Sequence, residues 1–138
     1  MTTRIGINGF GRMGRLSLRA GWDRKEFEWV RINEINMDAA GGAHLLNFDS
    51  VQGRWNEEST GTDDNIIIKD CNISYTSITN IKDGNWGDCD IVLECTGKFR
   101  SPEKLQSYFN QGVKKVIVSS PVKDRALNVV YGINDREY

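Results

Sequence analysis

The chain of 138 residues carries a formal net charge of −1, with 38% hydrophobic and 27% charged residues. That length suits one compact domain with its own core and leaves no room for two. A net charge so close to zero creates no general field for nucleic acid or anionic lipid, and no apolar run is long enough to cross a bilayer.

The amino-terminal third of the chain predicts a strand, a tight turn, a helix and a second strand. Residues 4–8 form a short apolar run that ends in a glycine cluster. Residues 12–22 carry apolar side chains at helical spacing, namely Met13, Leu16 and Ala20. Residues 27–33 then alternate apolar and polar side chains, as strands do. Together these segments predict a βαβ unit with parallel strands.

The middle of the chain predicts a helix followed by a hairpin. Residues 38–48 suit a helix, although two adjacent glycines weaken it. Residues 52–64 are polar and rich in turn-forming residues, so they predict an irregular connection. Residues 66–69 and 73–76 flank a polar turn, which indicates a small antiparallel hairpin inserted at the edge of the parallel sheet.

The remaining third predicts three more strands and one helix. Residues 90–94 suit a strand, and Ser101–Pro102 supplies an N-cap and a first helical proline. Gly112 should end that helix. Residues 116–119 predict a buried strand, and residues 127–131 predict a last one.

Strands that alternate with helices, without any internal repeat, are typical of an α/β protein. The sequence therefore predicts a doubly wound, mostly parallel sheet of the Rossmann fold, with a small antiparallel hairpin insertion. We expect residues 1–138 to form a single nucleotide-binding domain.

One glycine-rich motif stands at the turn between the first strand and the first helix. Gly9, Gly11 and Gly14 have the spacing G-x-G-x-x-G, and Glu34 follows about twenty positions later, at the end of the second strand. The first glycine should permit a tight turn, the second a close approach to a pyrophosphate, and the third close packing of helix on sheet. The helix amino terminus would then face the phosphates.

The same motif indicates which cofactor binds. The Glu34 carboxylate would accept hydrogen bonds from ribose hydroxyls and repel a 2′-phosphate, which favours NAD over NADP. Arg12 and Arg31 are nearby in the sequence and could instead help a phosphate to bind. S-adenosylmethionine is an alternative, but its usual turn is G-x-G-x-G, and Met13 breaks that pattern. A strand-to-helix turn without any ligand is the structural alternative.

Few residues are suited to metal binding or redox chemistry. The three cysteines, Cys71, Cys89 and Cys95, show no C-x-x-C spacing, and His44 is the only histidine. The sequence therefore predicts no metal site and reduced, structural thiols. The start of the chain lacks the charged and then apolar build of a secretion signal, which indicates a cytoplasmic protein.

Five segments in order along the chain resemble the phosphorylating glyceraldehyde-3-phosphate dehydrogenases. Residues 7–15 are similar to the start of that family, residues 48–55 to its Y-D-S-x-H-G-x-F stretch and residues 94–99 to its E-S-T-G-x-F. Residues 116–121 and 131–134 resemble its I-I-S-A-P and G-V-N. The resemblance covers the chain from end to end.

The resemblance implies a role for each of several residues. Asn8, Arg12 and Met13 would border the pyrophosphate, and Glu34 would hold the adenosine ribose. A further set would lie beside the adenine or on the path to the nicotinamide: Thr96, Gly97, Phe99 and Ser119. From residue type alone, Phe99 would be a core aromatic and Thr96–Gly97 a plain strand-end turn.

The chain departs from the family pattern at two places. Glu34–Ile35 stands where the family commonly has aspartate and proline, and Gln52 where it has histidine. Residues 32–35 and 43–46 resemble a subgroup linked to arsenate detoxification, in which arsenate replaces phosphate. An erythrose-4-phosphate dehydrogenase is a second alternative, and a nucleotide-binding module without catalysis a third. Weak charge and the lack of a basic stripe count against RNA as its ligand.

The family's catalytic motif does not occur in this sequence. In the family, the cysteine of S-C-T-T-N-C attacks the aldehyde of a sugar phosphate with the help of a histidine, and hydride passes to NAD. Cys95 and His44 are better read as packing or surface residues, so we expect no catalytic residue here. The resemblance implies a homotetramer for the complete enzyme. The chain alone should bind NAD weakly, remain inactive, and expose apolar surface that promotes self-association.

Overall fold

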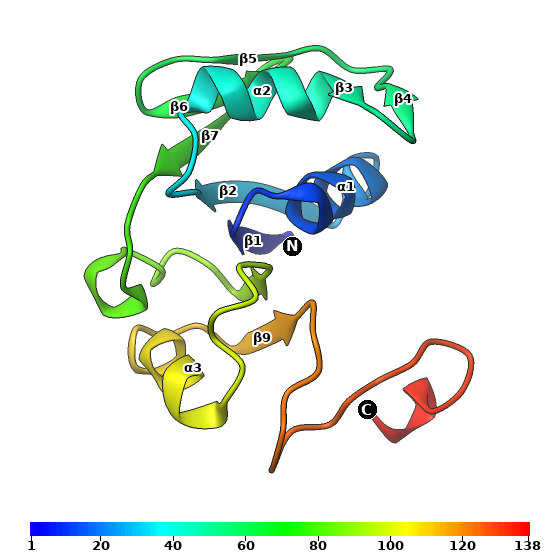
Figure 1. The fold of residues 1–138 in the computed structure, drawn as a ribbon, viewed down its shortest axis with the longest axis vertical. Coiled ribbons are helices and arrows are strands. Elements are labelled where there is room, and N and C mark those ends of the chain that lie inside the picture. The colour runs from blue at the N-terminus through cyan, green and yellow to red at the C-terminus, as the bar shows by residue number, and fades with distance from the viewer.

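The structure, a computed structural model, describes residues 1–138. Strands and helices alternate along most of the chain (Figure 1). In order they are β1 (Thr3–Asn8), α1 (Arg12–Gly21), β2 (Phe27–Asn33), α2 (Ala39–Asn47), β3 (Phe48–Asp49), β4 (Gly53–Arg54), β5 (Ser59–Gly61), β6 (Asn65–Ile68), β7 (Cys71–Thr76), the 3-10 helix η1 (Ile81–Asp83), β8 (Ile91–Glu94), α3 (Pro102–Asn110), β9 (Lys115–Val118) and the 3-10 helix η2 (Asp135–Glu137). None of the helices has the length and apolar character needed to cross a membrane.

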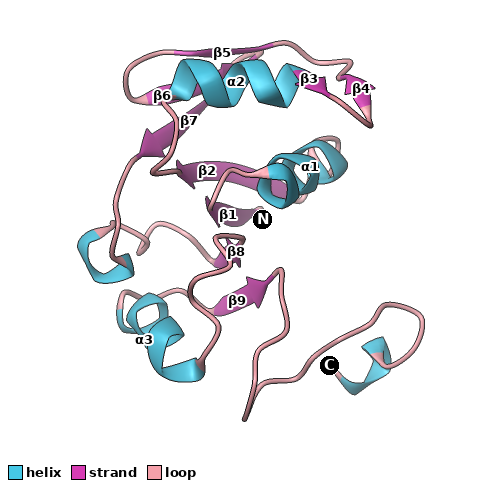
Figure 2. Ribbon diagram, viewed as in Figure 1, coloured by secondary structure: helices cyan, strands magenta, loops and turns pink.

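Seven strands form one sheet in the order β5-β6-β7-β2-β1-β8-β9 (Figure 2). Strands β7, β2, β1, β8 and β9 pair in parallel, whereas β5, β6 and β7 pair in antiparallel fashion. The predicted doubly wound, mostly parallel sheet is confirmed, as is the β6–β7 hairpin. The hairpin is more than an edge insertion, because β7 pairs with β2 and so belongs to the parallel sheet.

The central strand β1 shows how the two faces of the sheet are filled. Ile5 and Ile7 belong to a cluster of 13 buried residues that includes side chains of α1 and α2. Gly6 points to the opposite face, where an added Cβ would lie 2.7 Å from Cys89 Sγ and 3.2 Å from the ring of Trp86. Those two residues belong to a second cluster of seven residues, which includes side chains of α3. Helices therefore cover both faces, as the doubly wound fold requires.

Helix α1 is where the sequence predicted it, but its buried face is different. The structure buries Gly14 and Leu18, while Met13 is 54% exposed. An added Cβ on Gly14 would lie 2.3 Å from Gly9 O and 3.0 Å from Ile7 Cγ2, so the helix touches the sheet along its glycine. The spacing of the apolar residues Met13 and Leu16 predicted the wrong buried face for α1, because the helix packs through a glycine, which is not recognised as a hydrophobic residue.

Both other helices begin at residues that the sequence analysis had identified. Asp38 caps α2 by accepting from Gly41 N at 2.8 Å. Ser101 caps α3 by accepting from Lys104 N, and Pro102 follows it as the first helical residue. Gly112 follows the end of α3 with φ +100, a conformation that suits glycine at a helix terminus.

The irregular stretch predicted for residues 52–64 contains two short strands, β4 and β5. β5 was missed because its residues are polar and turn-forming. Its position depends on side chains, since Asn47 accepts from Ser59 N at 2.8 Å and donates to Ser59 O at 2.9 Å. The β3–β4 pair forms a separate two-stranded sheet next to α2.

Of the two strands predicted near the carboxyl end of the chain, one is present and one is not. β9 confirms the strand predicted at residues 116–119, but it lies at the sheet edge and is buried on one face only. Val116 and Val118 pack against the second core cluster, whereas Ile117 is 55% exposed. Residues 127–131 form no strand, because they run away from the sheet and pair with nothing (Figure 1). Asn128 and Asn134 instead bind the main chain of this segment through their side chains.

Candidate functional site

A pocket of about 180 Å³ opens where the parallel strands β1, β2, β7 and β8 end. Four short segments line it, one after each strand. They comprise Asn8, Gly9 and Gly11 at the end of β1, residues 33–36 at the end of β2, Ile78 and Thr79 after β7, and Cys95, Thr96, Lys98 and Phe99 after β8. The chain goes from β1 to β2 on one side and returns to β8 on the other, so the pocket lies at the topological switch point of the sheet.

Each glycine of the motif has a distinct steric reason in the structure. Gly9 has φ +93, and an added Cβ would lie 2.7 Å from both Cys95 C and Thr96 N. Gly14 lies against Gly9 O, as described for α1. Gly11 has no heavy atom within 4 Å of an added Cβ, so no steric demand of this chain requires a glycine there. Open space at Gly11 leaves room for a ligand to approach the main chain.

The amino end of α1 is free of the groups that usually occupy a helix terminus. The N-cap residue is Gly11, no side chain accepts a cap hydrogen bond, and the first turn contains no acidic residue. The free N–H groups and the positive end of the helix dipole are therefore available to an anion. The geometry fits a phosphate-bearing ligand.

Glu34 lies at the rim of the pocket and is 6% exposed. Its Oε2 accepts from Phe10 N at 2.8 Å, within the glycine turn, and its Oε1 accepts from Asn36 N at 2.8 Å. The carboxylate thus ties the end of β2 to the glycine turn. Each carboxylate oxygen can accept a second hydrogen bond, so Glu34 can still receive a ligand hydroxyl.

Asn8, Asn33 and Thr96 form the floor of the pocket and belong to a buried polar network that the sequence analysis did not identify. The Glu94 carboxylate is 0% exposed and accepts from Asn8 Nδ2 at 2.9 Å and from the Tyr108 hydroxyl. Its other oxygen accepts from Thr96 N at 3.0 Å and Thr96 Oγ1 at 2.6 Å. Burial and the Glu94 carboxylate raise the pKa of Tyr108, which keeps its hydroxyl protonated as a donor.

A second asparagine extends this network across the sheet. Asn33 Nδ2 donates to Asn8 Oδ1 and to Ile78 O, both at 2.9 Å. Its Oδ1 accepts from Thr76 Oγ1 at 2.8 Å and Ile78 N at 2.7 Å. All four hydrogen-bonding positions of this amide are used inside the protein. An asparagine at the end of a predicted strand was the only signal for it in the sequence.

The residues that the resemblance assigns to the adenine, Thr96, Gly97 and Phe99, lie together after the end of β8. Thr96 Oγ1 accepts from Lys98 N at 3.1 Å, and Gly97, with φ +72, shapes that turn. Phe99 packs against the second core cluster and also lines the pocket, so its ring is both a core aromatic and a wall of the site.

Five of the predicted site residues do not line the pocket: Arg12, Met13, Gly14, Gly97 and Ser119. Arg12 is exposed and forms an ion pair with Asp49 at 2.8 Å. Met13 is exposed on α1, on the solvent side. Ser119 follows β9, where its N–H donates to Glu94 O at 3.0 Å. Asn8 lines the pocket, but its amide is engaged in the buried network, so its contribution to the floor is structural.

None of the cysteines is prepared to act as a nucleophile. Burial raises the pKa of Cys71 and Cys95, and burial with the nearby Asp88 raises that of Cys89 to about 12. His44 lies on the exposed side of α2, with its ring 5.1 Å from the Phe48 ring. No activated thiol is present at the pocket.

Known proteins carry the same sequence pattern. Residues 3–102 match the family described as "Glyceraldehyde 3-phosphate dehydrogenase, NAD binding domain". Glyceraldehyde-3-phosphate dehydrogenase 3 from Nostoc sp. is 52% identical over 140 residues, which cover 100% of this chain and 42% of that protein. The protein of that name from Cereibacter sphaeroides is 41% identical over 97% of this chain and 40% of its own length. The chain therefore belongs to the NAD-binding domain family of glyceraldehyde-3-phosphate dehydrogenases, and NAD is its cofactor.

Proposed function

We propose that the pocket at the ends of β1, β2 and β8 is where NAD binds, and that residues 1–138 act as one NAD-binding unit. The observation that carries this proposal is the uncapped amino end of α1 beside the empty space at Gly11. The proposed binding residues are Asn8, Gly9, Gly11, Arg12, Met13, Gly14, Glu34, Thr96, Gly97, Phe99 and Ser119.

Different residues would bind different parts of the dinucleotide. The main chain from Gly11 into α1 would hold the pyrophosphate, with N–H groups that no side chain caps. Glu34 would accept from the adenosine ribose, and Phe99 would form one wall for the adenine. Ser119, at the end of β9, would lie toward the nicotinamide.

Glu34 also supports a preference for NAD over NADP. A 2′-phosphate bound at the ribose position would meet a buried carboxylate, and like charges repel strongly where water is excluded. Arg12 does not offset this repulsion, because its guanidinium is paired with Asp49.

The parent reaction that we propose is the phosphorylating oxidation of glyceraldehyde 3-phosphate, in which bound NAD accepts the hydride. The chain spans 42% of the Nostoc relative, and the family's S-C-T-T-N-C motif does not occur in it. The raised pKa values of its cysteines support a chain that binds cofactor without itself attacking the aldehyde. The homotetramer implied by the resemblance is the proposed assembly of the complete enzyme.

Calorimetric titration of Glu34 variants tests the cofactor role. Glu34→Ala should weaken NAD binding about tenfold, because a charged acceptor of the ribose hydroxyls is lost. Glu34→Gln should narrow the difference in affinity between NAD and NADP, since the repulsive charge is gone. Glu58→Gln, an exposed glutamate that makes no hydrogen bond or ion pair, is the matched control.

Two results would contradict the assignment. If Glu34→Ala binds NAD as tightly as the control while keeping its thermal melt, the carboxylate does not hold the ribose. If Glu34→Gln leaves the ratio of the NAD and NADP affinities unchanged, the carboxylate does not select between them.

A further inference from the structure

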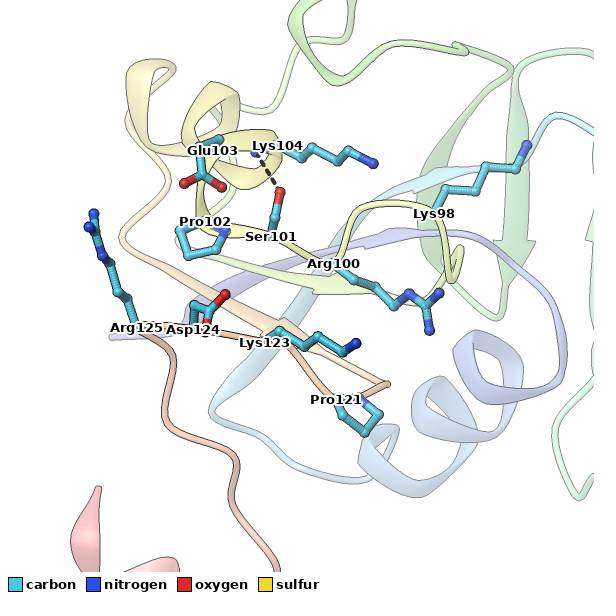
Figure 3. Close-up of a pocket in the computed structure, with 10 residues that line it drawn as sticks. All are labelled: Lys98, Arg100, Ser101, Pro102, Glu103, Lys104, Pro121, Lys123, Asp124 and Arg125. Carbon is cyan, nitrogen blue, oxygen red and sulfur yellow. Dashed lines mark hydrogen bonds between the residues drawn. The ribbon is translucent and has the colours of Figure 1, made fainter.

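A second and larger hollow lies outside the dinucleotide pocket, between the amino end of α3 and the segment that follows β9 (Figure 3). Its volume is about 890 Å³, and no aromatic or branched aliphatic side chain lines it. Five of its ten lining residues are basic: Lys98, Arg100, Lys104, Lys123 and Arg125. The chain as a whole has a net charge of −1, so positive charge is locally concentrated here.

These five cations have no partners within the protein. None of them forms an ion pair, and none donates a hydrogen bond from its side chain. Six basic residues elsewhere in the chain do pair with carboxylates, for example Lys114 with Asp90 at 2.8 Å and Arg31 with Asp88 at 2.9 Å. A cluster of unpaired cations repels itself, so an external anion would relieve a real electrostatic cost.

The charges are also segregated within the hollow. In Figure 3, Lys98, Arg100, Lys104 and Lys123 extend toward one side, whereas the Glu103 carboxylate extends toward the other. The turn after Lys123 separates its side chain from that of Arg125, because Asp124 and Arg125 both adopt left-handed φ values, of 59° and 57°. The side that four cations share contains no carboxylate among the residues drawn.

The lining indicates the chemical class of the ligand. Without an aromatic or aliphatic wall there is no platform for a base or another apolar ring. Several lysines act as separate point charges, which suits a ligand with several anionic oxygens better than a single carboxylate. The positive end of the α3 dipole, at Pro102, adds to the same field. A compound with two or more phosphate groups meets these requirements.

We propose that this hollow is a second anion site, which binds a small compound carrying two or more linked phosphate groups. It is separate from the dinucleotide pocket, with which it shares only Lys98. A nucleic acid fits less well, because the cations fill one hollow and form no extended stripe, and no aromatic ring is present for base stacking.

Titration of the protein with sodium tripolyphosphate at fixed ionic strength, followed by calorimetry, tests the proposal. The double variant Lys104→Gln/Lys123→Gln removes two exposed charges that form no ion pair and no side-chain hydrogen bond, so folding should be unchanged. We expect tripolyphosphate affinity to fall about tenfold or more, because charge-assisted contacts to phosphate are lost. Lys82→Gln, an exposed lysine of η1, should bind as the unchanged protein does.

NAD and a single-stranded oligonucleotide complete the test. Saturating NAD should leave tripolyphosphate binding in place, and the double variant should bind NAD normally. Equal tripolyphosphate affinity of the double variant and the Lys82→Gln control would overturn the proposal, as would full displacement of tripolyphosphate by NAD. Tighter binding of oligothymidine than of tripolyphosphate, lost in the double variant, would overturn it in favour of a nucleic-acid surface.

Discussion

Replacing Tyr108 by phenylalanine removes one hydroxyl from the buried network of Asn8, Glu94 and Tyr108 and keeps the ring. The ring can still pack edge-on against Trp86, with 5.2 Å between centroids. The lost hydroxyl donates to the Glu94 carboxylate and accepts from Asn8 Nδ2 at 2.7 Å, in a fully buried place. A hydrogen bond to a charged group contributes about 1.5–3 kcal/mol and one to a neutral group about 0.5–1.5 kcal/mol. We therefore expect Tyr108→Phe to lower the free energy of unfolding by about 2–4 kcal/mol.

Urea unfolding followed by circular dichroism measures this loss, with an unchanged m-value as the sign that only stability has changed. Tyr131→Phe is the matched control, because Tyr131 is 92% exposed and its hydroxyl makes no hydrogen bond. A double-mutant cycle with Glu94→Gln should give a coupling energy of about 1 kcal/mol or more. A loss below about 0.5 kcal/mol, which is usual for a surface substitution, would refute the role given to the hydroxyl.

Three further predictions follow from other contacts. Gly9→Ala places a Cβ within 2.7 Å of the main chain after β8, at a residue with φ +93, and should destabilise the folded protein by about 1–3 kcal/mol. Gly11→Ala, which meets no neighbouring atom, should leave the thermal melt unchanged and weaken NAD binding. Equal melting temperatures for the two variants would contradict the steric argument. Hydrogen bonds from Lys114 and from Arg4 N lower the pKa of Asp90 from 3.8 to about 2. The protein should therefore be more stable than its Asp90→Asn variant above pH 3.8, and this difference in stability should disappear as the pH falls through about 2. An acid titration in which the two proteins keep the same difference in stability would count against this assignment. Iodoacetamide at pH 8 should leave Cys89 unmodified in the folded protein, because burial raises the pKa of this thiol to about 12. Rapid alkylation of Cys89, found by peptide mass mapping, would show that the thiol is not protected.

The glycine turn was predictable because its logic is local. The spacing of Gly9, Gly11 and Gly14 depends on a strand and a helix that follow each other directly in the chain. The Glu34 position was predictable for the same reason, as the end of the next strand. What the sequence did not reveal is that Glu34 already holds the glycine turn through Phe10 N.

The buried network beneath the pocket was not predictable, because it joins residues that are far apart in the chain. Asn8 and Glu94 are 86 positions apart and Asn8 and Tyr108 are 100 positions apart. A single sequence contains no signal that these side chains meet, and Tyr108 reads as an ordinary core aromatic of α3.

The failed strand at residues 127–131 has a different cause. Its apolar residues have the pattern of a buried strand, but a strand also needs a neighbour to pair with, and Val129 and Val130 remain exposed. Periodicity reports what a segment could bury and cannot report whether a partner is present. The buried face of α1 was predicted wrongly for a related reason, because Gly14 packs against the sheet without contributing a hydrophobic side chain to the sequence pattern.

The two core clusters occupy successive parts of the chain, and this has a consequence for folding during synthesis. Every buried member of the first cluster lies between Ile5 and Tyr75, and every buried member of the second between Ile81 and Val113. A nascent chain that ends before β8 already contains all residues needed to close the first cluster around β1, β2, α1 and α2. One edge of β1 stays unpaired until β8 leaves the ribosome, because those strands meet across 86 positions of sequence. The ribosome-bound half-domain would therefore present an open strand edge and the bare Gly6 face, and the network of Asn8, Glu94 and Tyr108 could form only after Tyr108 has been made.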